Sequence, residues 1–351
     1  MKDLGASCPV PFGRYDRIVL GHGSGGRLTA NLIRDLFMPA LGGEILSRLE
    51  DQAVCPVDLP AGARLAFTTD SFVVRPIFFP GGDIGSLAIH GTVNDLAVGG
   101  ARPLLMSAAF ILEEGLPLEE LARIAASMRA ACDRSGVQLV TGDTKVVDRG
   151  KGDKVFITTS GIGVVQPGVS LSISSARAGD RLLVSGPVGD HGIAILSVRE
   201  GLEFETQLVS DSAPLADLTR VMLEACPSIA CMRDPTRGGL SSALNEMAAA
   251  SKVGVKLQET AIPIRPSVVA ACEVLGLDPL YVACEGRLVA AVGEADAERL
   301  LELVRSHPLG RDAALIGRVV EDHPGIVTLL SRAGGERVVS LLSGEQLPRI
   351  C

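Results

Sequence analysis

The chain has 351 residues, of which 47% are hydrophobic and 21% charged, so it can build two packed domains. Its formal net charge is −8 and it has no basic run, so we do not expect it to bind nucleic acid. No membrane association is expected either, because the longest apolar stretch, Pro103–Leu112, is too short to cross a bilayer, and residues 1–16 lack the apolar core of a secretory signal.

Segments rich in β-branched residues alternate with helical ones. In the first half we predict strands at 63–69, 137–142 and 154–165 and helices at 84–100 and 118–136. After a polar stretch at 166–179 the alternation restarts, with strands at 181–186, 253–258, 287–292 and 314–320 and helices beginning at 190, 214, 239 and 265. The pattern predicts an α/β (α+β) chain of two domains. We place an extension at 1–16, the first domain at 17–168, the second at 169–337 and a flexible tail at 338–351.

A glycine-rich stretch near the N-terminus, GHGSGG (Gly21–Gly26), matches the G-x-G-x-x-G pattern. A dinucleotide fold would also need a strand that ends in an acid about 20 residues further on. The sequence there, MPALGGEILSRLED, is a poor strand, so we reject that interpretation. Gly25 and Gly26 could still bind phosphate through backbone N–H groups, although a tight turn at a helix start explains them equally well.

Four aspartates stand at the edges of apolar elements: Asp51, Asp70, Asp95 and Asp143. Each alone is explained as a cap or a satisfied turn residue, since a lone buried charge is costly. Together, with few bases nearby, they suggest a shared cation, and Mg²⁺ prefers such oxygen ligands. Lys145, two residues after Asp143, could reach a phosphate group.

The second half contains two further motifs. In DPTRGGL (Asp234–Leu240), Asp234 and Pro235 fit the N-cap and first position of a helix, while the paired glycines would also let a ligand approach. In CEGR, Glu285 precedes an apolar strand, where a structural acid and a general base are both open.

The chain ends in PRIC, and Cys351 differs from the other seven cysteines because a terminal thiol has little to pack against. The cysteines are scattered and form no C-x-x-C pair, which indicates free thiols in a reducing, cytoplasmic setting.

These motifs occur in one order: TTDSFVVRPIFFPGGDIG, HGTVNDLAVGGARP, GDTKVV, DPTRGGL, CEGR and PRIC. Together they resemble the HypE family of hydrogenase maturation factors, from about Val19 to Cys351. That family belongs to the PurM-like superfamily of aminoimidazole ribonucleotide synthetase, selenophosphate synthetase and thiamine-phosphate kinase. The resemblance implies a first domain that binds ATP with Mg²⁺ and forms a homodimer through its sheet, and a second α/β domain that closes over it.

The resemblance also implies an activity. In this family a HypF carbamoyltransferase places a carbamoyl group on the C-terminal thiol. ATP is then used to dehydrate the carbamoyl group to a thiocyanate, and ADP and phosphate are released. The cyano group passes to iron on a HypC–HypD scaffold and becomes a cyanide ligand of [NiFe] hydrogenase. Carried over residue by residue, the catalytic groups are Cys351, Lys145 and Glu285; the metal ligands Asp51, Asp70, Asp95 and Asp143; and the nucleotide contacts Gly25, Gly26, Asp70, Asn94, Asp95, Asp143 and Thr144.

Three other interpretations compete with this one. Selenophosphate synthetase resemblance would require a reactive cysteine in a glycine-rich N-terminal loop followed by lysine, and Cys8 in SCPVPFGR has no such lysine. A non-catalytic ATP-binding scaffold would use the tail only to dock partners. An accidental terminal cysteine would leave the other motifs unexplained.

Overall fold

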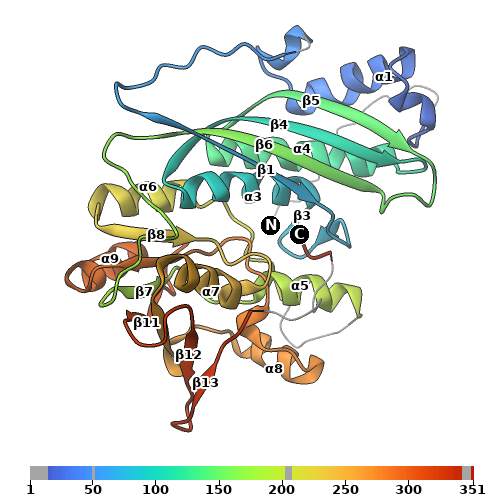
Figure 1. Ribbon diagram of the computed structural model, residues 1–351. Coiled ribbons are helices and arrows are strands. Elements are labelled where there is room, and N and C mark those ends of the chain that lie inside the picture. Colours follow the sequence, from blue (N-terminus) through green and yellow to red (C-terminus); the bar gives the residue numbers. More distant parts are fainter. Residues whose placement is uncertain (1–14, 50–51, 202–207, 342–348) are drawn as a thin grey trace, which may run out of the picture.

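The computed structural model describes residues 15–49, 52–201, 208–341 and 349–351. Two sheets with their helices form two α/β units, which meet around helix α3 (Ile84–Val98) (Figure 1). This arrangement confirms the predicted fold class of two α/β units. Nothing among the described helices is long and apolar enough to cross a membrane.

The first sheet has four strands in the order β1-β6-β4-β5. The strands are β1 (Arg64–Phe72), β4 (Ala101–Glu113), β5 (Gln138–Val147) and β6 (Val155–Val165). Only β4 and β5 are parallel, and helix α4 (Leu118–Ser135) makes the crossover between them. Strand β4 was not predicted from the sequence, where Pro103–Leu112 was considered only as an apolar stretch too short to cross a bilayer.

Helices α3 and α4 cover one face of this sheet (Figure 1). Helix α3 is buried on nearly all sides because it also contacts the second unit. Its start is fixed by Asp83, whose carboxylate accepts hydrogen bonds from the backbone N–H groups of Gly85 (2.7 Å) and Ser86 (3.0 Å). The opposite face of the sheet is open, and Phe67 on it is 71% exposed.

Short elements complete the first unit. The hairpin β2 (Phe78–Phe79) and β3 (Gly82–Asp83) precedes α3. The N-terminal part carries η1 (Leu20–Gly23), α1 (Arg27–Leu32), the π-helical η2 (Ile33–Phe37), α2 (Met38–Leu41) and η3 (Leu46–Arg48).

The second sheet has seven strands in the order β13-β12-β9-β11-β7-β10-β8. These are β7 (Arg181–Val184), β8 (Ile229–Arg233), β9 (Gly254–Gln258), β10 (Val289–Val292), β11 (Ala314–Val320), β12 (Val327–Leu330) and β13 (Glu336–Val338). The accompanying helices are α5 (Asp190–Arg199), α6 (Ala216–Ala225), α7 (Gly239–Ser251), η4 (Glu259–Ala261), α8 (Pro266–Leu275), η5 (Pro279–Tyr281) and α9 (Glu294–Ser306). The predicted division at residue 168 falls between β6 and β7, and the exact domain bounds stay a prediction.

Candidate active site

The last three residues, Arg349–Cys351, dock against the segment that follows β1. The backbone N–H of Val73 donates to the Cys351 carbonyl and that of Arg75 donates to the Arg349 carbonyl, both at 3.2 Å. The side chain of Ile350 is 4% exposed and joins the hydrophobic cluster of the first unit. The C-terminus therefore lies between the two units (Figure 1).

The Cys351 thiol lines a cavity of about 210 Å³ to which both units contribute. Its other lining residues are Thr69, Asp70, Gly91, Asp95, Asp234, Thr236, Arg237 and Glu285. Gly91 allows α3 to approach β1, because a Cβ there would lie 2.8 Å from the ring of Phe72. The cavity thus encloses a thiol, four carboxyl groups and one guanidinium group.

The carboxyl groups disfavour one another's ionised forms. Burial, and to a smaller degree the charge of Asp95, raises the pKa of Asp70. Burial raises the pKa of Asp95, against the hydrogen bond that Thr68 donates to it at 2.7 Å. Burial and then the neighbouring Asp95 raise the pKa of Asp234 to about 7. Such a cluster carries more negative charge than its surroundings neutralise, which favours a bound cation.

Glu285 is the most deeply buried of the four, at 2% exposure. Its backbone is held on both sides: its N–H donates to Asp211 Oδ1 and its carbonyl accepts from Asn94 Nδ2, each at 3.0 Å. Its side-chain Oε1 is buried without a hydrogen-bond partner. Burial, and after it the charges of Asp234 and Asp211, raises its pKa well above the ordinary value. An unpaired buried carboxyl oxygen in a cavity fits a group that exchanges protons with a ligand.

The thiol of Cys351 is poorly ionised in this position. Burial and then the nearby Glu285 raise its pKa to about 12, while Arg237 acts in the opposite direction. A docked, unmodified Cys351 is therefore a weak nucleophile, since the thiolate is the reactive form.

A second group of predicted residues lies elsewhere, on β5. Lys145 Nζ pairs with Asp143 at 2.8 Å, and both side chains are exposed. The Asp143 carboxylate also accepts from the N–H of Thr144 at 2.8 Å, and the pair with Lys145 lowers the pKa of Asp143. The loop with Gly25 and Gly26 lies beside this strand, because a Cβ on neighbouring Gly23 would stand 2.5 Å from the Val146 backbone nitrogen.

The two groups are separated by the sheet. In register, Asp143 pairs with Ala109, Ala109 with Thr158, and Thr158 with Ser71. Three strand spacings amount to about 14 Å. Asp70, the neighbour of Ser71, points to the opposite face. One ion in a single chain cannot contact both Asp70 and Asp143.

The predicted metal site is consequently divided. Asp70 and Asp95 line the cavity, Asp143 lies on β5, and Asp51 falls outside the described residues. Over residues 15–49, 52–201, 208–341 and 349–351, no three His, Cys, Asp or Glu side chains are already arranged around a common metal position. Mg²⁺ and its ligands stay a prediction.

Asn94, expected to contact the nucleotide, has another set of partners. Its amide donates to the carbonyls of Ala213 and Glu285, and its oxygen accepts from the N–H of Leu215 at 2.8 Å. The side chain is 1% exposed and all its polar atoms are used. These contacts favour a role in joining the two units and positioning Glu285.

The N-cap interpretation of Asp234 is wrong. Helix α7 begins at Gly239 and is capped by Gly238, whose φ of 76° is one that glycine adopts without strain. Asp234 lies five residues earlier and lines the cavity, together with Thr236 and Arg237. The motif DPTRGGL marked this segment, but the sequence did not show that its acid faces Asp95.

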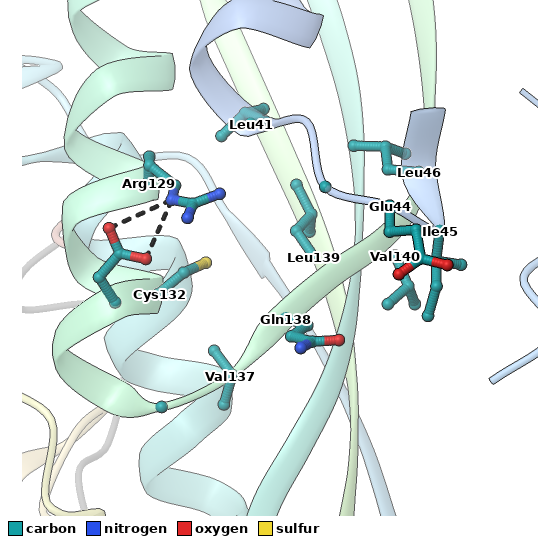
Figure 2. A pocket seen from close by; sticks show the side chains of 13 residues that line it. Leu41, Glu44, Ile45, Leu46, Arg129, Cys132, Val137, Gln138, Leu139 and Val140 are labelled. Carbon is teal, nitrogen blue, oxygen red and sulfur yellow. Dashed lines mark hydrogen bonds and ion pairs between the residues drawn. The ribbon is translucent and has the colours of Figure 1, made fainter. Parts of the chain in front are cut away.

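A larger hollow of about 420 Å³ lies away from these acids, between α4 and the edge of β5 (Figure 2). Arg129 and Asp133 form an ion pair at its rim at 2.9 Å, and Cys132 is buried beside it. Burial raises the pKa of Cys132 to about 12, so this thiol is inert. The hollow offers no reactive group, and the cavity at Cys351 is the better candidate.

Comparison with known proteins shows the family to which the chain belongs. The AIR synthase related protein N-terminal and C-terminal domain families match residues 49–165 and 177–329. Carbamoyl dehydratase HypE of Cupriavidus necator is 57% identical over 348 residues, 99% of this chain and 98% of that protein. The chain belongs to the HypE family of carbamoyl dehydratases.

Solved structures of HypE proteins agree with this assignment. A HypE in complex with ATP is 48% identical, with a TM-score of 0.91 over 95% of this chain and 99% of its own. A HypE in a HypE–HypF complex is 45% identical, with a TM-score of 0.77 over 89% and 99%. The resemblance drawn from the sequence motifs is thereby confirmed, and selenophosphate synthetase is set aside.

Proposed function

We propose that this HypE-family chain uses ATP to dehydrate an S-carbamoyl group on its own Cys351 to a thiocyanate, releasing ADP and phosphate. The thiocyanate would supply the cyanide ligands of the [NiFe] hydrogenase iron. The observation that carries the proposal is the docked C-terminus, which brings the Cys351 thiol into the cavity that also contains the unpartnered Oε1 of Glu285.

The reaction needs a better leaving group than an amide oxygen. Transfer of the γ-phosphoryl group to the carbamoyl oxygen breaks the bond to ADP and forms a C–O–P linkage. Loss of the two nitrogen protons and departure of phosphate then give S–C≡N, so that carbamoyl plus ATP becomes cyano plus ADP and phosphate. We assign proton removal to Glu285, because a carboxylate with a strongly raised pKa is a strong base once ionised.

Enclosure contributes to the same chemistry. A tethered substrate in a small cavity reacts as an intramolecular partner, which raises its effective concentration. The docked tail also keeps water from the carbamoyl thioester and the phosphoryl donor.

The negative charge of the carboxyl cluster suits Mg²⁺, which would also bind the phosphates of ATP. A bound cation would favour the ionised forms of Asp70, Asp95 and Asp234, whose pKa values are raised, and it could pair with the unpartnered Oε1 of Glu285. We propose that these three aspartates hold the metal, which would offset the charge that develops on the transferring phosphoryl group. The complex of a 48% identical HypE with ATP supports the choice of nucleotide.

The position of Lys145 supports a homodimer. It lies with Asp143 on the open face of the first sheet, which also presents the exposed side chains of Leu65, Phe67 and Ile111. We propose that a second copy covers this face and that Lys145, Thr144, Gly25 and Gly26 reach the nucleotide across that interface.

We further propose HypF as carbamoyl donor and a HypC–HypD complex as cyanide acceptor. A related HypE forms a complex with HypF, which supports the first of these. The seven cysteines in the described part of the chain are free, in keeping with the cytoplasmic location that we propose.

A scaffold that binds ATP without turning it over is the second candidate. The test is ADP release by protein carrying a carbamoyl group on Cys351. We expect one ADP per carbamoyl group and its loss in Glu285→Gln. Bound nucleotide without ADP release would support the scaffold instead.

A further inference from the structure

The docked tail is held from two sides. The carbonyls of Arg349 and Cys351 accept from the backbone that follows β1, whereas the carbonyl of Ile350 faces helix α5. There, His191 Nε2 lies 2.9 Å from the Ile350 oxygen. Without this contact, the Ile350 carbonyl would be buried and unpaired, which is costly.

The contact fixes the protonation of His191. A carbonyl oxygen only accepts, so Nε2 must carry the hydrogen and donate. His191 is fully buried, and burial lowers its pKa to about 4, so the ring is neutral and Nδ1 accepts. The Ser210 hydroxyl lies 2.8 Å from Nδ1 and donates to it, while its oxygen accepts from the N–H of Ser212 at 3.1 Å. The result is one directed chain from Ser212 through Ser210 and His191 to the tail.

Packing fixes the ring as well. The rings of Phe79 and His191 pack edge to face, with their centroids 5.5 Å apart. From the same helix, Arg199 donates through Nη2 to the Arg349 carbonyl at 2.6 Å and to the Arg75 carbonyl at 2.7 Å. Helix α5 therefore contacts the tail at two successive carbonyls, on either side of the Ile350 side chain.

We propose that His191 is a positioning residue that latches the C-terminal tail by donating its Nε2 hydrogen to the Ile350 carbonyl, with Ser210 holding the required tautomer. The latch sets where the next residue, Cys351, points in the cavity. When the tail leaves to meet a partner, the buried Nε2–H loses its acceptor, so the docked position is favoured over partly inserted ones. This inference rests on the proposed function for its purpose, but the docking itself is measurable without any turnover.

The experiment measures alkylation of Cys351 by N-ethylmaleimide in the full-length protein, with the rate taken from the C-terminal peptide by mass spectrometry. Cys55, which is partly exposed, serves as an internal standard. In His191→Leu we expect Cys351 to react about ten-fold faster, because the Ile350 carbonyl would be left unpaired in the docked tail. A ten-fold factor corresponds to about 1.4 kcal/mol. His191→Gln keeps an N–H donor and should stay within about two-fold of the parent.

Two further variants separate the latch from general damage. Ser210→Ala removes no contact with the tail, but it removes the hydroxyl that holds the tautomer of His191. We therefore expect the alkylation rate of Cys351 to rise about three-fold, which corresponds to the loss of one neutral hydrogen bond. His22→Leu alters another buried histidine, at the N-terminal 3₁₀ turn, and should leave the Cys351 rate unchanged. If His191→Leu fails to fold, Ser210→Ala and His191→Gln still decide the matter.

Parent-like protection of Cys351 in His191→Leu, or equal loss of protection in His191→Gln and His191→Leu, would overturn the latch. Failure of the proposed function is distinguishable: Cys351 would then be protected by His191 as described, while no carbamoyl group is ever dehydrated.

Discussion

Asp234→Asn should make the ligand-free protein less sensitive to rising pH. In the folded chain the pKa of Asp234 is raised from 3.8 to about 7, by burial first and by Asp95 second. The folded state therefore holds a proton that the unfolded chain has released above pH 4. The stability linked to this group is fully present below pH 3.8 and is lost as the pH rises through about 7.

The size of the effect follows from the same values. Each pKa unit is worth about 1.4 kcal/mol, so the full shift sets a ceiling of about 4 kcal/mol. Asp234 is only half-buried, and solvent screening reduces that figure to about 2 kcal/mol. Between pH 5 and pH 8 we expect the parent to lose about 1 to 2 kcal/mol more stability than Asp234→Asn.

Urea unfolding of both proteins at pH 5 and pH 8, without metal or nucleotide, measures this difference. Asp35→Asn is the control, because pairing with Arg34 lowers the pKa of Asp35 and its contribution is already constant above pH 5. Adding Mg²⁺ and ATP should stabilise the parent more than Asp234→Asn, since at a given concentration a ligand stabilises the fold more when it binds the folded state more tightly. Equal pH dependence in the parent and Asp234→Asn would refute the inference that the ionised acids of this cluster destabilise the fold when no cation is bound.

Four further outcomes are expected. Cys351→Ser should bind nucleotide normally, as measured by calorimetry. It should accept no carbamoyl group, as measured by mass spectrometry, because a hydroxyl is a much weaker nucleophile than a thiol. Several residues added after Cys351 should impair turnover although the thiol is intact, since they would have to enter the cavity of about 210 Å³ or displace the docked tail; normal ADP release would contradict the need for docking. Lys145→Ala should lower kcat about 100-fold or more with little change in ATP affinity, as for a group matched to the transition state; an effect on affinity alone would argue against that role. Phe67→Asp should convert the proposed homodimer to monomers in sedimentation, because a charge in an apolar interface is costly; an unchanged dimer would place the interface elsewhere.

The sequence predicted most of the elements because their signals are local. Helix α4 has an amphipathic pattern and ends at Ser135, where it is capped by Gly136, whose φ of 67° suits glycine. Strand β6 alternates buried and half-buried positions, as its β-branched pattern predicts. Strand β4 was missed because it is paired on both sides and its sequence from Pro103 to Leu112 is an apolar run interrupted only by Ser107, a pattern that does not distinguish a strand from a helix.

The candidate site was predictable only in part. Acid residues at element edges were visible, but their grouping depends on pairing between distant strands. Asp70 and Asp143 read alike along the chain, yet the sheet order puts them three strands apart and on opposite faces. Likewise, nothing local in DPTRGGL tells an N-cap from a cavity acid, since the distinction depends on where Asp95 lies in space. The partners of His191 are contributed by residues far along the chain and had no sequence signal.

The central claim is that Cys351 carries the reacting group. The most direct measurement is mass spectrometry of the C-terminal peptide, first after incubation with a carbamoyl donor system and again after ATP is added to the loaded protein from which that system has been removed. We predict a carbamoyl adduct on Cys351 alone, followed by loss of the mass of one water when ATP is supplied to the loaded protein. An adduct on another cysteine, together with a fully active Cys351→Ala, would contradict the account.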